Sequence, residues 1–437
     1  MVGKLNMKTI RTNQLKDNIN ENIVINGWVY NSRCSGKIGF LMLRDGFSLV
    51  QCIISINDVG ENKFNEFKTY TQESSIKVVG QIVENDRAPG GCEILIKDIE
   101  LYHLSKDYPI TPKEHGTDFL MNNRHLWLRS KRQHAILKIR HQIIKSTRDF
   151  FDSNDFTLVD TPIFTPNAAE GTTTLFETEY FGHKAYLSQT GQLYGEASAM
   201  AFGRHYNFGP TFRSEKSKTR RHLTEFWMVE PEIAFCDINE NIDWSEKLVK
   251  FIVKHVLENN QDELAILERD TKTLYSLLDR SFPRVSYTEC IEKLNKDGFD
   301  INWGDDFGSP EETHIAEGYD CPVIVHRFPS EIKAFYMKHD PDNDKVVLGM
   351  DVLAPEGYGE IIGGSEREIN LEVLHERIKN EGLDRADYEW YLDLRKYGSV
   401  PHSGFGMGIE RVVAWICKLP HVRETIPFAR TIGRLNP

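Results

Sequence analysis

The chain has 437 residues, enough for two or more domains that each bury a core of their own. A hydrophobic content of 40%, a charged content of 27% and a net charge of −12 describe an ordinary globular protein and exclude a surface that is basic throughout, though not a local basic patch. No apolar run is long enough to span a membrane, the N-terminus lacks an apolar signal core, and the seven cysteines form no CxxC pair, so we expect a cytoplasmic protein with no membrane partner, zinc site or disulfide framework.

The first predicted domain, residues 1–105, is a small β-barrel. Five β-rich runs are separated by turn residues, and a segment with helical spacing follows the third run. The runs are Asn22 to Arg33, Gly39 to Arg44, Leu49 to Ile54, Ser75 to Val83 and Glu93 to Leu101, and the helical segment is Phe64 to Tyr70. This pattern is typical of an OB-fold, which commonly binds single-stranded nucleic acid.

A larger domain is predicted over residues 131–437. Residues 106–130 are polar and irregular, and we interpret them as a linker that leads into a helix. That helix, Ile136 to Phe151, has apolar residues at helical spacing. The next run, FTLVDTPIFTP, is expected to form a strand, and its Pro162 suits a strand edge or end.

The middle of the chain predicts a hairpin with a basic tip. The strands are expected at Thr211 to Glu215 and Leu223 to Glu230, and the tip carries Lys216, Lys218, Arg220 and Arg221. Period-two geometry places Arg213 and Glu215 on one face of the first strand. On the return strand, one face carries Glu225 and Trp227, and the other carries Phe226 and Met228.

These residue types suit a nucleoside triphosphate, because arginine grips phosphate with its planar fork and an aromatic ring stacks on a base. The alternative is a solvated hairpin whose charges only prevent edge pairing.

Residues from about 237 to 340 are interpreted as a mainly helical, charged insertion without a chemical signature. Its expected helices are Trp244 to Glu258, Glu263 to Leu278 and Ser286 to Asn295. After the insertion, apolar and polar residues alternate again, as in β-strands, and Asp351 and Glu360 fall at neighbouring positions of this β-rich region. Paired carboxylates beside phosphates usually hold Mg²⁺, whereas a solvated acidic strand is the alternative interpretation.

A glycine-rich segment near the C-terminus, HSGFGMGIER, leads into a predicted helix. Arg411 falls in the first turn of that helix, where the helix dipole also favours an anion. The segment lacks the ending of a P-loop and the spacing of a dinucleotide-binding loop.

The sequence FRSE followed by RHLTEF, together with GFGMGIERVV, resembles motifs 2 and 3 of class II aminoacyl-tRNA synthetases. The run TFRSEKSKTRRHLTEFWMVEPE is similar to the asparaginyl-tRNA synthetases of the aspartyl/asparaginyl subgroup. Both motifs occur in the family's order, and the resemblance covers nearly the whole chain. It implies an α+β protein in which an N-terminal five-stranded OB-fold reads the anticodon. A class II catalytic domain, an antiparallel sheet flanked by helices, follows.

The resemblance implies ATP-dependent ligation of asparagine to its tRNA through an asparaginyl-adenylate, with Mg²⁺ as cofactor. It makes Arg213 and Arg411 the catalytic residues. The implied ATP-binding residues are Arg213, Glu215, His222, Phe226 and Arg411, and the implied metal ligands are Asp351 and Glu360. The family is homodimeric through motif 1, which corresponds here to the region around Pro162.

The resemblance also implies residues that bind the amino acid and the anticodon. Glu170 and Gln192 would hold the α-amino group, and Glu225 and Arg367 the side chain. The implied anticodon-binding residues are Arg33, Phe40 and Gln51. For Phe40 taken alone, the barrel core is the better interpretation.

The choice of amino acid rests on Gly195. Aspartyl enzymes carry a lysine three residues after the glutamine that corresponds to Gln192, and this chain has glycine there. Without that cation, the pocket suits a substrate with a neutral side-chain amide better than one with a carboxylate.

Three alternatives stay open. The first is an aspartyl enzyme, including one that charges both amino acids. The second is an asparagine synthetase on the same fold, which the complete OB-fold disfavours. The third is a non-catalytic RNA-binding protein, which the complete set of site residues disfavours.

Overall fold

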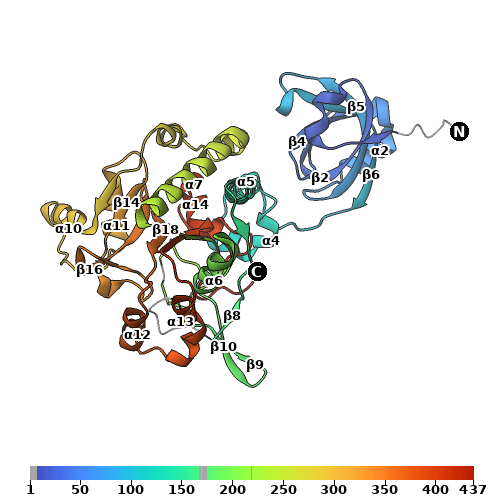
Figure 1. Ribbon diagram of the computed structural model, residues 1–437. Helices are drawn as coiled ribbons and strands as arrows, with labels where there is room; N and C mark the ends of the chain where they lie inside the picture. Colours follow the sequence, from blue (N-terminus) through green and yellow to red (C-terminus); the bar gives the residue numbers. More distant parts are fainter. Residues whose placement is uncertain (1–6, 167–168, 170–174, 218) are drawn as a thin grey trace. The chain divides into compact units, whose positions relative to one another are not determined.

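The computed structural model describes residues 7–166, 169, 175–217 and 219–437, and divides the chain into two compact units, Met1–His115 and Gly116–Pro437 (Figure 1). Within these described ranges, none of the helices is both long and apolar enough to cross a membrane.

The first unit is a closed β-barrel, which confirms the predicted OB-fold. Its strands are β1 Lys8–Thr9, β2 Asn22–Ser35, β3 Ile38–Arg44, β4 Leu49–Ser55, β5 Ser75–Glu84 and β6 Cys92–His103, with α1 Ile56–Val59 and α2 Glu61–Phe67 after β4. The order is β1-β2-β3-β4-β6-β5, and a further β2–β5 pairing closes the barrel. Side chains alternate between core and surface, with Leu41, Leu43 and Cys52 inside, and Phe64 and Phe67 of α2 join that core.

The second unit is built on a sheet that has eight strands among the described residues, in the order β13-β14-β17-β18-β19-β12-β11-β7. The strands are β7 Thr157–Leu158, β11 Arg204–Phe212, β12 Glu225–Ala234, β13 Arg284–Ser286, β14 Val323–His326, β17 Gly349–Ala354, β18 Gly359–Glu366 and β19 His402–Gly408. The pairs from β14 to β11 are antiparallel, as predicted for this domain, whereas β13 and β7 join the two edges in parallel.

Smaller strands and the helices complete this unit. The strands are β8 Phe164–Thr165, β9 Glu177–Tyr180, β10 His183–Leu187, β15 His339–Asp340 and β16 Asn343–Val347. The helices are α3 Thr117–Asn122, α4 Arg124–Trp127, α5 Lys131–Ser153, α6 Gln192–Phe202, α7 Ile238–Asn259, α8 Gln261–Ile266, α9 Lys272–Ser276, α10 Tyr287–Lys296, α11 Ser309–Glu317, α12 Leu371–Asn380, α13 Glu389–Lys396 and α14 Ile409–Ile416.

Helices α5 and α7 cover one face of the large sheet. Phe150 of α5 meets Trp244 of α7 edge-on, with ring centroids 6.0 Å apart. Ser245 of α7 lies against Met350 of β17, with 3.8 Å between Oγ and Sδ. Because side chains alternate along a strand, the neighbouring Asp351 points to the opposite face. That opposite face carries the cavity described below.

Two sequence expectations about this unit need correction, and a third needs an addition. Residues 117–127 of the expected linker form α3 and α4, and the buried guanidinium of Arg124 donates to the carbonyls of Ile426 (2.9 Å) and Pro427 (2.8 Å). The insertion is mainly helical, as expected, and it also supplies β13 and β14 to the sheet. Pro162 lies between β7 and β8 and belongs to neither strand.

Candidate active site

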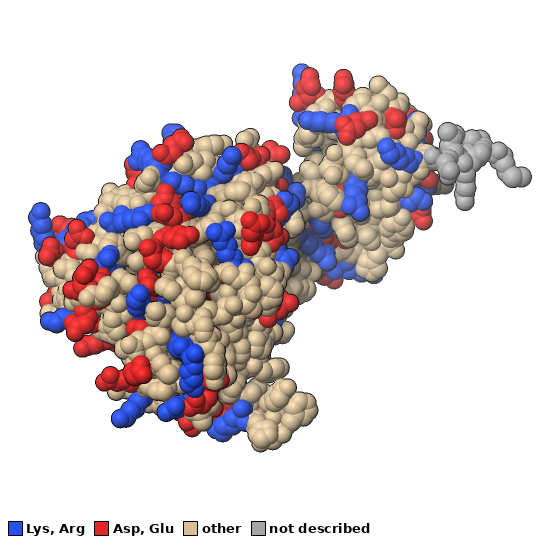
Figure 2. Space-filling view, in the orientation of Figure 1, with Lys and Arg blue, Asp and Glu red and all other residues tan. Residues whose placement is uncertain are grey.

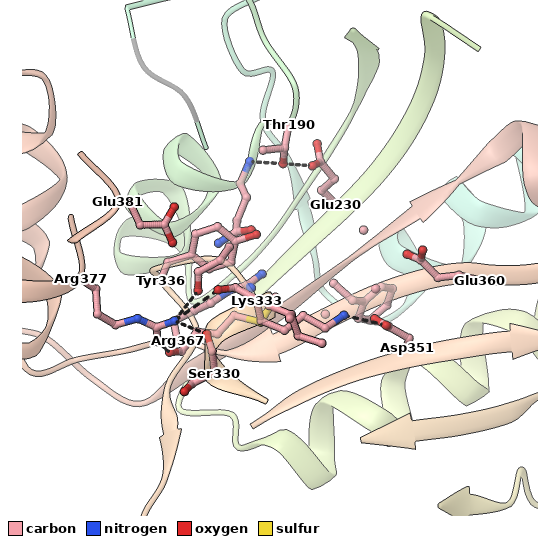
Figure 3. A pocket seen from close by; sticks show the side chains of 18 of the residues that line it. Thr190, Glu230, Ser330, Lys333, Tyr336, Asp351, Glu360, Arg367, Arg377 and Glu381 are labelled. Atoms are coloured by element: carbon pink, nitrogen blue, oxygen red, sulfur yellow. Dashed lines mark hydrogen bonds and ion pairs between the residues drawn. The ribbon is translucent and has the colours of Figure 1, made fainter. Parts of the chain in front are cut away.

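A cavity of about 900 Å³ opens on the face of the sheet away from α7 (Figure 3). Side chains from β12, β17, β18 and β19 form its floor, and the segment 330–339 forms one wall. Arg377 of α12 secures that wall by donating to the carbonyls of Ala334 (3.1 Å) and Met337 (2.6 Å). A second, smaller cavity adjoins the first, since Arg213 and Glu360 line both.

The floor contributed by β12 is set by strand alternation. Phe226, Met228, Glu230 and Glu232 line the two cavities at every second position. Glu225 is on the other face, which disagrees with its expected place beside the substrate side chain. At that end of the strand, the backbone of Glu225 forms a bridge with Arg430. The sequence missed Glu230 and Glu232, although extending the face of Phe226 by period two would have found both.

Arg213, Phe226, His222 and Arg411 come together around the smaller cavity. The strand β11 ends at Phe212, and the backbone N–H of Arg213 donates to the Thr224 carbonyl (3.0 Å) across the start of the turn. The guanidinium of Arg213 lies 5.4 Å from the centre of the Phe226 ring. A guanidinium and an aromatic ring are thus adjacent, an arrangement that suits a phosphate beside a stacked base.

Glu215 follows the end of the strand, so the alternation expected to pair it with Arg213 does not extend to it. It is absent from the lining of both described cavities. Burial, with the charges of Arg411 and Arg213, lowers the pKa of His222, and Glu215 opposes this shift. His222 therefore stays neutral at neutral pH, as a hydrogen-bonding group and not a cation.

The insertion holds the basic turn between β11 and β12. Arg221 donates to Glu312 (2.8 Å) and Thr313 (2.9 Å) of α11 and to the Gly357 carbonyl (2.5 Å). The contacts to Glu312 and Thr313 give the insertion a positioning role that nothing in its sequence indicated, and the contact to Gly357 joins the same turn to the β17–β18 connection.

Asp351 and Glu360 converge at the junction of the two cavities. Both face Gly363, where an added Cβ would lie 2.9 Å from Glu360 Oε1 and 3.3 Å from Asp351 Oδ1. Lys333, a residue that sequence reasoning missed, donates to Asp351 Oδ2 (2.8 Å), and Arg411 donates to Glu360 Oε2 (3.0 Å). Figure 3 shows the Lys333–Asp351 contact beside Glu360.

Two adjacent carboxylates suit Mg²⁺, which is usually bound by one or two carboxylates plus phosphate and water. No cluster of three His, Cys, Asp or Glu ligands occurs in the part of the chain that the structure describes. Burial raises the pKa of Asp351 to about 6. The charge of Lys333 opposes this shift, and the charge of Glu360 adds to it. The donor set therefore fits a metal that arrives with a polyphosphate.

The far end of the larger cavity is built around Arg367, which is buried. Its Nε donates to Glu232 Oε2 (3.3 Å), its Nη2 donates to Glu232 Oε1, and its Nη1 donates to Ser365 Oγ (2.8 Å). Burial opposes ionisation of this guanidinium, but Glu232 and Glu196 outweigh burial and raise the pKa of Arg367. The result is a charged donor facing the cavity.

Glu230 lies on the same face, two residues before Glu232. It accepts from the backbone N–H of Gly191 (2.9 Å) and from Asn207 Nδ2 (2.9 Å). Figure 3 shows Glu230 beside Thr190, which also donates to it. This part of the cavity thus offers the guanidinium of Arg367 and the carboxylates of Glu230 and Glu232.

Gly195 of α6 packs against Glu232, one of the residues that line this part of the cavity. A Cβ added at Gly195 would lie 3.0 Å from His205 Nε2 and 3.3 Å from Glu232 Cγ. Burial lowers the pKa of His205 to about 4, so its ring is neutral at neutral pH. Gly195, which stands where the aspartyl enzymes carry lysine, therefore contacts the cavity only through Glu232 among the described residues.

Gln192 begins α6 and lines the cavity, as expected for a residue that contacts the amino acid. Glu170 lies outside the described residues.

In the first unit, the structure brings Arg33, Phe40 and Gln51 to one outer face of the barrel. Arg33 lies over the Phe40 ring, with its guanidinium carbon 4.9 Å from the ring centre. Phe40 alternates with the core residues Gly39 and Leu41 and is half-buried, so it is not barrel core. Gln51, paired with the next outward position of β3, donates to Glu93 (2.9 Å).

Comparisons with known proteins agree with this geometry. The family "tRNA synthetases class II (D, K and N)" matches residues 116–432, and the family "OB-fold nucleic acid binding domain" matches residues 23–102. The asparagine–tRNA ligase of Pelotomaculum thermopropionicum is 55% identical and covers 99% of this chain and 100% of its own length. The asparagine–tRNA ligase of Desulforamulus reducens is 56% identical and covers 97% of this chain and 98% of its own length.

A solved structure is similar over the whole chain. The asparaginyl-tRNA synthetase of Pyrococcus horikoshii, in complex with asparaginyl-adenylate, has 42% identity and a TM-score of 0.95 and covers 100% of both chains. With its two domains and these relatives, the chain belongs to the asparagine–tRNA ligase family of class II tRNA synthetases.

Proposed function

We propose that the protein ligates asparagine to tRNA in two steps at the cavity described above. The asparagine carboxylate attacks the α-phosphate of ATP and gives asparaginyl-adenylate and pyrophosphate. The terminal ribose hydroxyl of tRNA then takes the acyl group. The observation that carries this proposal is that two adjoining cavities share Arg213, with Phe226 in the smaller one and Arg367 in the larger one. We assign the ATP to the end at Arg213 and Phe226, and the amino acid to the end at Arg367.

Pyrophosphate exchange into ATP, with asparagine and aspartate supplied separately, tests the first step. Exchange with asparagine alone supports the proposal. Exchange with aspartate would favour an aspartyl or dual enzyme, and no exchange with either would favour a non-catalytic RNA-binding protein. Transfer of asparagine to tRNA separates the ligase from an asparagine synthetase.

Catalysis in this proposal comes from positioning and charge neutralisation, since the carboxylate of the substrate is itself the nucleophile. Arg213 holds the α-phosphate, and Phe226 stacks on adenine. Arg411 and His222 contact the γ-phosphate. Glu215 is assigned a contact to the nucleotide or the incoming tRNA end, on the resemblance alone.

Asp351 and Glu360 would hold Mg²⁺. The ion would neutralise charge on the ATP phosphates when bound. In its absence Lys333 and Arg411 are the cations that pair with these two carboxylates.

Metal binding at this pair should weaken as the pH falls through about 6, because protons compete with the ion for Asp351, whose pKa is raised to that value. Glu360 adds little to this pH dependence. Burial raises its pKa, but the charges of Arg411 and Lys333 outweigh burial, so the pKa of Glu360 is lowered. Below pH 6 the dissociation constant for Mn²⁺ should rise about tenfold per pH unit if one proton is displaced. Electron paramagnetic resonance of free Mn²⁺ measures it as the difference between wild type and Asp351→Asn at equal concentrations of a non-hydrolysable ATP analogue, whose own titration is common to both samples.

Asp351→Asn is the control for that titration. The variant should bind Mn²⁺ more weakly, and its binding should lack the part of the pH dependence that the carboxyl of Asp351 contributes. A wild-type constant that does not change with pH over this range would contradict the metal assignment.

At the amino-acid end, Gln192 accepts from the α-ammonium, with Glu170 as a second candidate from the resemblance. Arg367 donates to the amide oxygen of the side chain. Glu225 is replaced in this role by Glu230 and Glu232, which lie on the cavity face and can accept from the amide nitrogen.

In the first unit, Phe40 is proposed as a stacking platform for an anticodon base, Gln51 as a reader of that base and Arg33 as a phosphate or base contact. An aromatic ring on an outer barrel face is what stacking on single-stranded RNA requires. The cytoplasmic location stays a prediction from sequence.

We also propose a homodimer through the region around Pro162. Exposed aromatic residues gather beside it: Phe164 is 51% exposed, Tyr180 48% and Phe181 87%, and the rings of Phe164 and Tyr180 are 5.7 Å apart. Strands β9 and β10, which follow this region, project from the catalytic unit in Figure 1, and the tip between them carries few charges in Figure 2. An apolar surface of this kind favours a protein contact.

Sedimentation equilibrium of the wild type at micromolar concentration should give the mass of two chains. Phe164→Asp should shift that mass toward one chain by placing a charge in the contact. Tyr397→Asp, which alters a similarly exposed ring elsewhere, should not. A single-chain mass for the wild type would remove the dimer proposal.

A further inference from the structure

A buried carboxylate, Glu196 of α6, lies behind the amino-acid end of the cavity. It accepts from Gln192 Nε2 (3.0 Å), Tyr391 OH (2.9 Å), Arg395 Nη2 (2.7 Å) and His402 Nε2 (2.9 Å). All five residues are buried, and Tyr391 and Arg395 belong to α13 whereas His402 begins β19. Burial alone would raise the pKa of Glu196, but Arg395 and His402 outweigh it and hold the pKa far below its ordinary value. Glu196 is therefore an ionised acceptor.

This acceptor determines which way the Gln192 amide points. An ionised carboxylate only accepts hydrogen bonds, so the amide atom 3.0 Å from Glu196 Oε1 is the NH₂ nitrogen. The amide oxygen is left for the cavity, which Gln192 lines. The backbone N–H of Gln192 is also fixed, because it donates to Thr190 Oγ1 (3.0 Å).

The orientation matters for the substrate. An α-ammonium group is a donor only and needs an oxygen in front of it. A reversed Gln192 amide would present N–H groups to that ammonium and lose the contact.

We propose that Glu196 is a positioning residue for the α-ammonium of asparagine, acting by holding the amide oxygen of Gln192 toward the substrate. The inference rests on the proposed function, in which Gln192 contacts the amino acid. It assigns Glu196 to recognition of the α-amino group specifically, and not to recognition of the side-chain amide or of ATP.

A purely structural role is the competing explanation, since Glu196 also joins α6 to α13 and β19. The two explanations differ in which substrate group is affected. A structural defect would disturb the whole pocket, whereas a reversed Gln192 amide would affect only ligands that carry an α-ammonium.

The test uses Glu196→Gln in the full-length chain, with pyrophosphate exchange as the assay. The new amide can keep its oxygen toward Arg395 and His402, and then turns its NH₂ toward Gln192. The KM for asparagine should rise about tenfold or more, the range expected for a hydrogen bond to a charged group, while kcat and the KM for ATP change by less than about threefold. The inhibition constant of succinamate, which is asparagine without its α-amino group, should stay within about twofold of wild type.

Equal losses for asparagine and succinamate would overturn the proposal in favour of a structural role, and so would no loss for either. Tyr391→Phe is the matched control: it removes one donor to Glu196 but leaves the carboxylate, so the preference for asparagine over succinamate should be kept.

Gln192→Ala covers the case in which Glu196→Gln does not fold. It should lose the same preference for asparagine over succinamate, and a retained preference would overturn the proposal. Wild-type protein without asparagine-dependent exchange would instead reject the proposed function, so the two failures are distinguishable.

Discussion

Replacing Arg213 with alanine should lower asparagine-dependent pyrophosphate exchange by about 100- to 1,000-fold, the loss seen when a donor aimed at transition-state charge is removed. Arg213 lines both cavities, and its guanidinium lies over the Phe226 ring. In the proposed reaction negative charge builds on the α-phosphate as the carboxylate attacks. Removing the cation should therefore reduce kcat more than it raises the KM for asparagine.

Two variants control for this loss. Arg385→Ala removes an exposed arginine whose ion pair with Glu389 stays within one segment, and exchange should stay within about twofold. Phe40→Ala should have the opposite effects to those of Arg213→Ala. It should weaken tRNA binding about tenfold, as expected for a lost stacking platform, while exchange, which uses no tRNA, continues. If Arg213→Ala reduced tRNA binding as much as exchange, its assigned role would be wrong.

The OB-fold could be predicted closely because local signals carried it. The five expected strands agree with β2 to β6 to within a few residues, since apolar alternation and turn residues are readable in sequence. The helix α10 could also be predicted from local sequence, because Ser286 caps it and Glu289 completes the capping box. By contrast, the expected helix from Glu263 to Leu278 is divided into α8 and α9, a break that apolar spacing did not reveal.

The site was only partly predictable, and the errors have a common cause. Phe226 was placed at the nucleotide and Glu225 at the amino acid, yet adjacent residues of one strand face opposite sides. Because every second residue of β12 lies on the same face, the face that carries Phe226 also carries Glu230 and Glu232. Glu215 was placed beside Arg213 by the same rule, which fails because the strand ends at Phe212.

Other site residues had no local signal. Glu196 meets Arg395 and His402, each about 200 positions away in sequence, and Lys333 lies in a segment without a recognisable motif. Such partners are brought together only by the topology of the sheet and the helices around it. The structure therefore adds the groups that orient and neutralise the residues that the motifs identify.

Replacing Gly195 with lysine should lower kcat/KM for asparagine by about 100-fold, equivalent to about 2.7 kcal/mol, without creating aspartate activation. The glycine has no spare room, because even a Cβ would lie 3.0 Å from His205 Nε2 and 3.3 Å from Glu232 Cγ. A longer side chain must displace Glu232 from Arg367, and the introduced ammonium would then pair with Glu232.

The same geometry explains why aspartate should not be gained. A substrate carboxylate would still face Glu230 and Glu232, and the new cation would be used by Glu232, so the pocket would gain no net attraction for an anion. Pyrophosphate exchange with each amino acid at saturating ATP measures both effects. Ala201→Lys, at an exposed position of the same helix, is the matched control and should leave both values unchanged. Efficient aspartate exchange by Gly195→Lys would show that one cation alone separates the two specificities. Its absence is the expected result, because the new ammonium pairs with Glu232 and leaves no added attraction for the substrate carboxylate.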